Sequence, residues 1–95
     1  SMQLVIDIGN SFTKFAVFRG DEIVFLQTTD NLSQELVKML VADFPKIDVA
    51  ILSSVKEIEI KLINQLSGLM KLMVLRGSTL HFKCNCATNC TRASK

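Results

Sequence analysis

Gln3-Leu-Val-Ile-Asp-Ile-Gly-Asn-Ser-Phe-Thr-Lys-Phe-Ala-Val-Phe18 is the stretch that decides the fold of this chain. Its two ends are rich in β-branched and aromatic residues, which are typical of strands, and the residues between them are small or polar. We therefore expect a strand over residues 3–8, a tight turn that contains Gly9, and a second strand over residues 12–18. Asp7 lies near the end of the first strand, beside the turn.

A third strand and a first helix follow this hairpin. Turn residues at Arg19–Glu22 lead into a strand over residues 22–28, and three strands joined by tight turns predict an antiparallel meander. The apolar period then changes to that of a helix, which Pro45 ends. Asn31 or Ser33 could cap the start of this helix.

Two further strands and a second helix complete the pattern. Residues 48–53 form a short apolar run with polar ends, which suits a buried parallel strand. Ser54 and Glu57 have the spacing of a capping box, so we expect a helix that begins there and ends at Gly68. A fifth strand is expected over residues 70–75.

The predicted element order is β-β-β-α-β-α-β. Three antiparallel strands followed by βαβ units match the ribonuclease-H-like core of actin-like ATPases, sugar kinases and Hsp70 proteins, and the right-handed crossover rule is consistent with the parallel half. We therefore expect an α/β fold with a mixed five-stranded sheet over residues 2–78, as a truncated nucleotide-binding domain. Residues 79–95 show no clear period and are expected to form an irregular tail.

Composition narrows the class of protein. The chain has 95 residues, 48% of them hydrophobic, and a formal net charge of +2 from charges spread along its length. This predicts one small ordered domain and no nucleic-acid partner. No apolar run approaches the roughly 20 residues of a membrane span, and no secretory pattern follows Ser1, which resembles the remnant of a cleaved tag. Three cysteines, an odd number, favour a reducing cytoplasm.

The turn after the first strand has the composition of a phosphate site. Glycine permits close backbone approach, and turn amides with small polar side chains can donate to phosphate oxygens. A lysine adds positive charge, and a carboxylate is a hard ligand for Mg²⁺, often through water. The candidate phosphate-binding residues are Asp7, Gly9, Asn10, Ser11, Thr13 and Lys14, with Asp7 as the candidate Mg²⁺ ligand. The alternative is an ordinary hairpin turn in which Asp7 and Asn10 bond only to local amides.

Two motifs resemble those of type III pantothenate kinases. The stretch Leu4-Val-Ile-Asp-Ile-Gly-Asn-Ser-Phe-Thr-Lys14 looks like the N-terminal phosphate-binding motif of that family. Asp48-Val-Ala-Ile-Leu-Ser-Ser-Val55 is similar to its second motif, an apolar strand that ends in Ser-Ser-Val. The resemblance covers residues 2 to roughly 83.

This resemblance implies a kinase that transfers the γ-phosphoryl group of ATP to the primary hydroxyl of pantothenate, the first step toward coenzyme A. It also implies Mg²⁺, a monovalent cation (K⁺ or NH₄⁺), a cytoplasmic location and a homodimer. It assigns the six candidate residues to the ATP site. Ser53 and Ser54 would lie near the cleft on the substrate side, although Ser54 is also a candidate helix cap.

The chain departs from the family pattern near its C-terminus. The family carries a Tyr-Ala-Thr-Pro segment and then a Gly-x-Asp-Arg motif whose aspartate is the general base. Here Cys86-Ala-Thr-Asn89 stands in the first place, with Cys86 at the tyrosine position, and Gly-x-Asp-Arg is missing. Loss of a general base costs about 10²–10⁴-fold in rate, so this polypeptide is predicted to be inactive. A truncation or reading-frame change near residue 84 would explain the ending.

Three alternatives stay open. The first is a noncatalytic interaction protein on the same fold, like the Bvg accessory factor. The second is another member of the superfamily, such as a sugar kinase or an actin-like ATPase. The third concerns only the tail, where His81, Cys84, Cys86 and Cys90 could present four zinc ligands or be a histidine and ordinary reduced thiols.

Overall fold

The computed structural model describes the backbone of residues 1–75, 80–86 and 89–94, and the side chains of residues 1–75. The elements in chain order are β1 (Met2–Ile8), β2 (Thr13–Arg19), β3 (Glu22–Thr29), α1 (Gln34–Asp43), β4 (Ile47–Ser54), α2 (Ile60–Leu69), β5 (Lys71–Leu75), β6 (Leu80–Cys86) and β7 (Asn89–Ser94). Every strand and helix expected before residue 76 is present, with ends shifted by a few residues.

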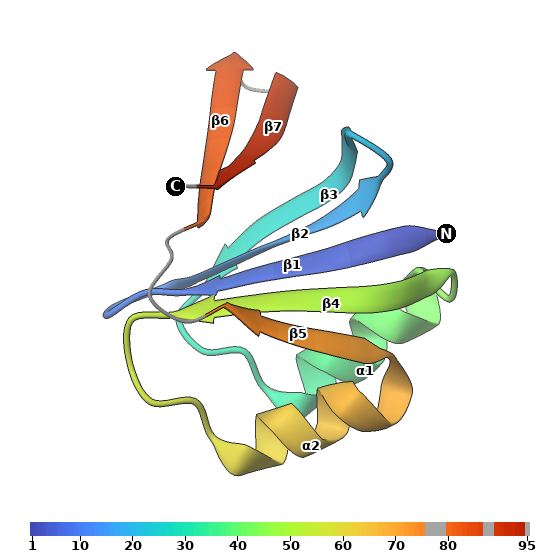
Figure 1. Ribbon diagram of the computed structural model, residues 1–95, viewed down its shortest axis with the longest axis vertical. Helices are drawn as coiled ribbons and strands as arrows, with labels where there is room; N and C mark the ends of the chain where they lie inside the picture. Colours follow the sequence, from blue (N-terminus) through green and yellow to red (C-terminus); the bar gives the residue numbers. More distant parts are fainter. Residues whose placement is uncertain (76–79, 87–88, 95) are drawn as a thin grey trace.

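A mixed sheet organises the molecule. Its five strands lie in the order β3-β2-β1-β4-β5, with antiparallel pairs on the β3 side of β1 and parallel pairs on the other side. Both helices lie against one face of this sheet (Figure 1). The prediction of an α/β fold with a mixed five-stranded sheet of ribonuclease-H-like order is therefore confirmed.

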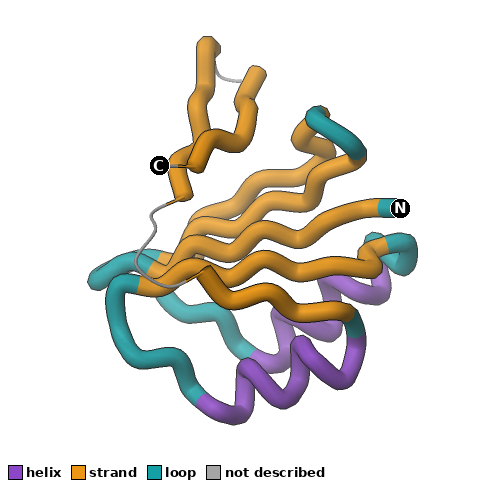
Figure 2. The backbone as a smooth tube through the Cα atoms, viewed as in Figure 1, coloured by secondary structure: helices purple, strands orange, loops and turns teal. Residues whose placement is uncertain are grey.

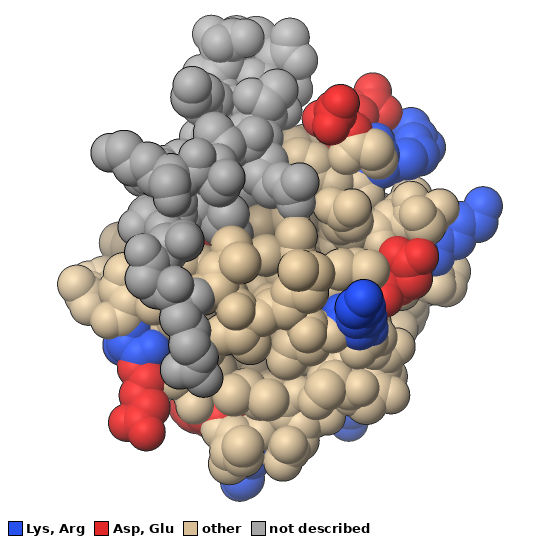
Figure 3. Space-filling model, in the orientation of Figure 1, with Lys and Arg blue, Asp and Glu red and all other residues tan. Residues whose placement is uncertain are grey.

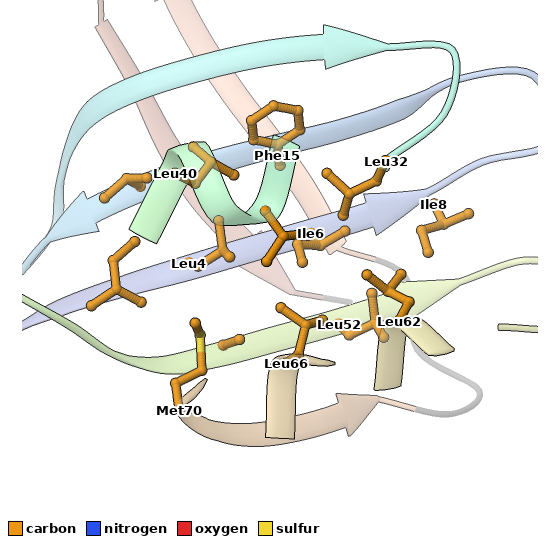
Figure 4. Close-up of a cluster of buried hydrophobic side chains, with 14 residues drawn as sticks. Leu4, Ile6, Ile8, Phe15, Leu32, Leu40, Leu52, Leu62, Leu66 and Met70 are labelled. Carbon is orange, nitrogen blue, oxygen red and sulfur yellow. The ribbon is translucent and has the colours of Figure 1, made fainter. Parts of the chain in front are cut away.

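The main core lies between the sheet and the two helices. Alternate residues of each strand point to one face, so the even-numbered residues of β1 meet the apolar stripes of α1 and α2. Figure 4 shows side chains from β1, β2, β4 and both helices converging in this layer. Among the largest fully buried side chains are Phe15, Leu4, Ile6, Leu52, Leu66 and Val37.

The opposite face of the sheet is also partly apolar. Val5, Ala16 and Phe18 are buried there as a smaller cluster. Because Val5 and Asp7 lie two residues apart on β1, the carboxylate belongs to this helix-free face.

The start of α1 agrees with one of the two predicted caps. The Leu36 amide donates to the Ser33 hydroxyl oxygen over 3.1 Å, so Ser33 rather than Asn31 is the N-cap. The helix ends at Asp43, two residues before Pro45, as expected.

The prediction for the start and end of α2 was wrong. The helix begins at Ile60, and its N-cap, Glu59, makes no side-chain capping bond. The Ser54 hydroxyl instead bonds to the backbone of Lys56 in a local turn, so no capping box forms. Gly68 lies inside the last helical turn and does not end the helix. The chain leaves the helix at Met70, whose backbone is extended and needs no glycine.

The prediction of an irregular tail also differs from the structure. β6 and β7 pair antiparallel as a two-stranded sheet. Leu80, Phe82 and Cys84 alternate with polar residues along β6, which is the two-residue period of a strand. This alternation is visible in the sequence, but it is short. The sequence that follows it has no apolar alternation of its own, so the pattern alone did not predict a hairpin.

Figure 3 shows one face of the molecule. Among the described residues, acidic and basic side chains are interspersed around the rim of this face, and neither charge is concentrated there. Within the described part of the chain, neither helix is long and apolar enough to cross a membrane.

Candidate functional site

The carboxyl ends of β1, β4 and β5 meet at one edge of the sheet. Two loops, the β1–β2 turn and the β4–α2 connection, lie together at this edge (Figure 2). They are joined by a hydrogen bond of 3.0 Å from the Val55 amide to the Ile8 carbonyl oxygen. In open α/β sheets, ligands bind in the crevice outside the carboxyl ends of the strands, so a binding site is expected at this edge.

The β1–β2 turn is closed and compact. The Gly9 amide donates to the Phe12 carbonyl oxygen over 2.8 Å, which leaves Asn10 and Ser11 exposed at the tip. A Cβ on Gly9 would lie 3.0 Å from that same carbonyl oxygen. This contact is tighter than most real Cβ contacts, so glycine here permits the close approach of two backbone segments and does not serve a positive φ angle. The exposed tip can present backbone amides and two small polar side chains to an anion.

A row of polar side chains crosses the sheet next to this turn. Asp7 on β1 is the register partner of Lys14 on β2 and of Ser53 on β4. Paired residues share a face, so all three lie on the helix-free side. Asp7 is partly buried, Ser53 is 3% exposed, and Lys14 is exposed. A carboxylate, an ammonium group and a hydroxyl are thus brought to one place from three strands.

Thr13 is separated from this row. It is the register partner of Ile8, so its side chain lies on the helix side of the sheet, and it is only 4% exposed. Neighbouring residues of a strand point to opposite faces, which explains why Thr13 and Lys14 do not act together. Of the six predicted ATP-site residues, the structure brings Asp7 and Lys14 together beside the tip of the turn and places the Thr13 side chain elsewhere.

A pocket of about 170 Å³ opens on the helix side of the same edge. Its lining residues are Ile8, Thr13, Asn31, Leu32, Lys56, Glu57, Ile58, Glu59 and Leu62. Asn31, Lys56 and Glu57 were not predicted from the sequence as site residues. The available signal was position, since Lys56 and Glu57 closely follow the carboxyl end of a predicted parallel strand.

The substrate-side candidates are dispersed. Ser53 lies in the Asp7 row, whereas Ser54 pairs with Ile8 and lines a second pocket of about 420 Å³ with Val74 and Leu75. Cys86 is the last residue of β6. Its side chain, like those of the other proposed zinc ligands, lies outside the described residues.

The chemistry of the Asp7 row fits the phosphates of a magnesium nucleotide. Among the described side chains, no group of three His, Cys, Asp or Glu residues could hold a metal ion by itself. Mg²⁺ in nucleotide sites needs only one or two carboxylates, because phosphate oxygens and water complete its shell. Asp7 could supply one such carboxylate, and Lys14 could supply a positive charge for a phosphate.

Comparison with known proteins adds one finding. The sequence model of the type III pantothenate kinase family matches residues 3–92 of the chain. No individual curated protein matches it.

The family match continues to residue 92, beyond the limit of roughly residue 83 expected from the motifs. The segment after residue 83 also contains most of a regular hairpin. The hypothesis of a truncation or reading-frame change near residue 84 was based on loss of the family pattern and of periodicity there. The family match and the hairpin both extend past that residue, whereas the Gly-x-Asp-Arg motif is still missing, so the hypothesis stays a prediction.

Proposed function

Because the chain belongs to the type III pantothenate kinase family, we propose that the β1–β2 turn binds the phosphates of Mg-ATP for phosphoryl transfer to pantothenate. The single observation that supports this is the row formed by Asp7, Lys14 and Ser53 beside the exposed turn, at the carboxyl edge of the parallel strands. In this proposal, ATP, pantothenate, a monovalent cation, a homodimer and a cytoplasmic location all follow from the family.

The roles of the residues differ with their positions. The backbone amides of Asn10 and Ser11 would hold phosphate oxygens at the tip of the turn, and Gly9, whose own amide bonds to Phe12, would permit the close backbone approach. Lys14 would offset phosphate charge, and Asp7 would hold Mg²⁺, which neutralises charge that develops on the transferred group. Ser53, nearly buried between β1 and β5, would keep its hydroxyl next to the Asp7 carboxylate.

Thr13 has a narrower role in this proposal. Its side chain lines the pocket on the helix side of the sheet. It would therefore stabilise the turn by packing on that side and contact no phosphate. Ser54 and Cys86 stay candidates for the substrate side only through the family resemblance.

The experiment is a titration of the isotopically labelled chain with Mg-ATP, followed through backbone amide resonances. We expect shifts concentrated in residues 7–14. Asp7→Asn should weaken Mg-ATP binding by about tenfold, or about 1.4 kcal/mol, with a smaller effect on ATP in the absence of Mg²⁺. Asp48→Asn is the matched control, because Asp48 is an exposed strand aspartate near the amino end of β4, away from the carboxyl edge.

A folded chain whose turn resonances do not respond to Mg-ATP would contradict the proposal. That result would favour the second candidate, a noncatalytic interaction protein on the same fold. The sequence observation that favours this candidate is the missing Gly-x-Asp-Arg motif.

A further inference from the structure

The three cysteines of the chain all lie in the β6–β7 hairpin. The backbone register makes Cys84 and Cys90 direct partners on the two strands. Cys86 has Asn89 as its partner, after a shift of register between Cys84 and Cys86. Of the three possible cysteine pairs, only Cys84 and Cys90 are therefore directly opposed in the register.

Directly opposed positions of an antiparallel pair suit a disulfide. Their Cα atoms lie about 5.5 Å apart in a hydrogen-bonded pair and about 4.5 Å apart in a non-hydrogen-bonded pair. Disulfides join Cα atoms about 4.4–6.8 Å apart, so both kinds of pair are compatible with the bond. The register thus favours the pairing of Cys84 with Cys90 over any pairing that includes Cys86.

We propose that the β6–β7 hairpin is an oxidative modification site, in which a disulfide of the glutathione class converts Cys84 and Cys90 into a cross-link and leaves Cys86 as a thiol. The thiolate of one cysteine attacks oxidised glutathione and releases one glutathione thiolate. The second cysteine then displaces the other glutathione from the mixed disulfide. Two thiol protons leave the protein, and its two electrons reduce one oxidised glutathione to two glutathione thiols.

This cross-link joins the two strands close to their connection. It reduces the conformational freedom of the unfolded hairpin and so stabilises the paired strands. The same hairpin carries Cys86, which stands at the tyrosine position of the family pattern. Oxidation would therefore modify the element next to that position without using Cys86 itself. The inference is independent of nucleotide binding, because it depends only on the register of β6 and β7.

The test uses the whole 95-residue chain, reduced and then equilibrated with mixtures of oxidised and reduced glutathione. Free thiols are alkylated before the disulfide is reduced, and the tryptic peptide Cys84–Arg92, which contains all three cysteines, is sequenced by mass spectrometry. The oxidised protein should lack the mass of two hydrogen atoms and carry the alkyl label on Cys86 alone. The same oxidation in denaturant is the control and should give a mixture of labelled positions.

Three single variants test whether the strand register, and not simple proximity in sequence, selects the cysteine pair. Cys86→Ser should oxidise with an equilibrium constant within about twofold of the unmodified chain, whereas Cys84→Ser and Cys90→Ser should lower it by at least about tenfold. Label on Cys84 or Cys90 in the native protein, or the same mixture with and without denaturant, would overturn the proposal. One tightly bound zinc ion per chain that protects all three thiols would also overturn it.

Discussion

At the residue scale, the contrast between Lys14 and Thr13 defines the candidate site. The two residues are neighbours in sequence, and both belong to a motif that resembles a phosphate site. The structure nevertheless places the Thr13 side chain among core residues and leaves Lys14 exposed beside Asp7. The two-residue period of a strand causes this separation, so a motif read as a continuous string overstates the number of side chains that meet one ligand.

Substitutions at these two positions should therefore have different effects. Lys14→Ala removes a charge that the proposal places near the phosphates, and we expect Mg-ATP affinity to fall by about tenfold. Thr13→Val keeps the shape of the side chain and should change that affinity by less than about twofold. Calorimetric titration of both variants measures the difference. Equal losses of affinity would show that Thr13 contacts the nucleotide.

At the element scale, α1 and α2 begin in different ways. Ser33 caps α1 through its side chain, whereas the N-cap of α2 makes no such bond. The first helix therefore carries a local start signal that its sequence displays. The second depends on the burial of Leu62 and Leu66 against the sheet.

Removal of the α1 cap should be measurable. Ser33→Ala leaves the Leu36 amide without its acceptor, and we expect a loss of about 1 kcal/mol in the free energy of unfolding. Ser67→Ala is the control, because Ser67 lies inside α2 and its hydroxyl bonds back to the Ile63 carbonyl oxygen. Replacing Ser67 should be neutral or slightly stabilising, since alanine favours the helix. Urea denaturation of both variants gives the two values, and equal losses would contradict the role of the cap.

Two glycines should respond to alanine with opposite signs. Gly20 has a φ of 63° in the β2–β3 turn, so Gly20→Ala should cost about 1 kcal/mol even though nothing crowds its Cβ position. Gly68 lies inside α2 with open space beside it, and Gly68→Ala should stabilise the protein by about 0.5–1 kcal/mol. Thermal unfolding of both variants checks the signs. A destabilised Gly68→Ala would mean that the end of α2 needs glycine after all.

At the scale of the whole molecule, the polar row of Asp7, Lys14 and Ser53 lies on one face of the sheet, at the carboxyl edge of the parallel strands. Phosphoryl transfer depends on positioning and charge stabilisation around the transferred group. The chain presents Asp7, Lys14 and the turn at one edge, and its sequence contains no Gly-x-Asp-Arg motif to supply the general base.

We therefore expect the 95-residue polypeptide to bind Mg-ATP without phosphorylating pantothenate at a measurable rate. Loss of the general base alone accounts for about 10²–10⁴-fold. The measurement is formation of phosphorylated pantothenate by the purified chain, followed by mass spectrometry. Turnover that disappears in Asp7→Ala would contradict this expectation and would show that other groups replace the missing base.

The sequence by itself determined the elements before residue 76 and their order. Local signals carry this information: β-branched runs for the strands, helical stripes for α1 and α2, and Gly9 and Gly20 for the turns. The sequence also placed Asp7 at the end of a strand beside a glycine turn, because a strand end and a turn are defined by neighbouring residues.

Only the tertiary structure decided which side chains share a surface. The proximity of Asp7, Lys14 and Ser53 depends on the registers of β1 with β2 and with β4. The register of β4 is set by packing across the sheet. The start of α2 at Ile60 and the pocket around Thr13 have the same origin. Contacts between residues far apart in the chain select these arrangements, and a local pattern holds no information about such contacts.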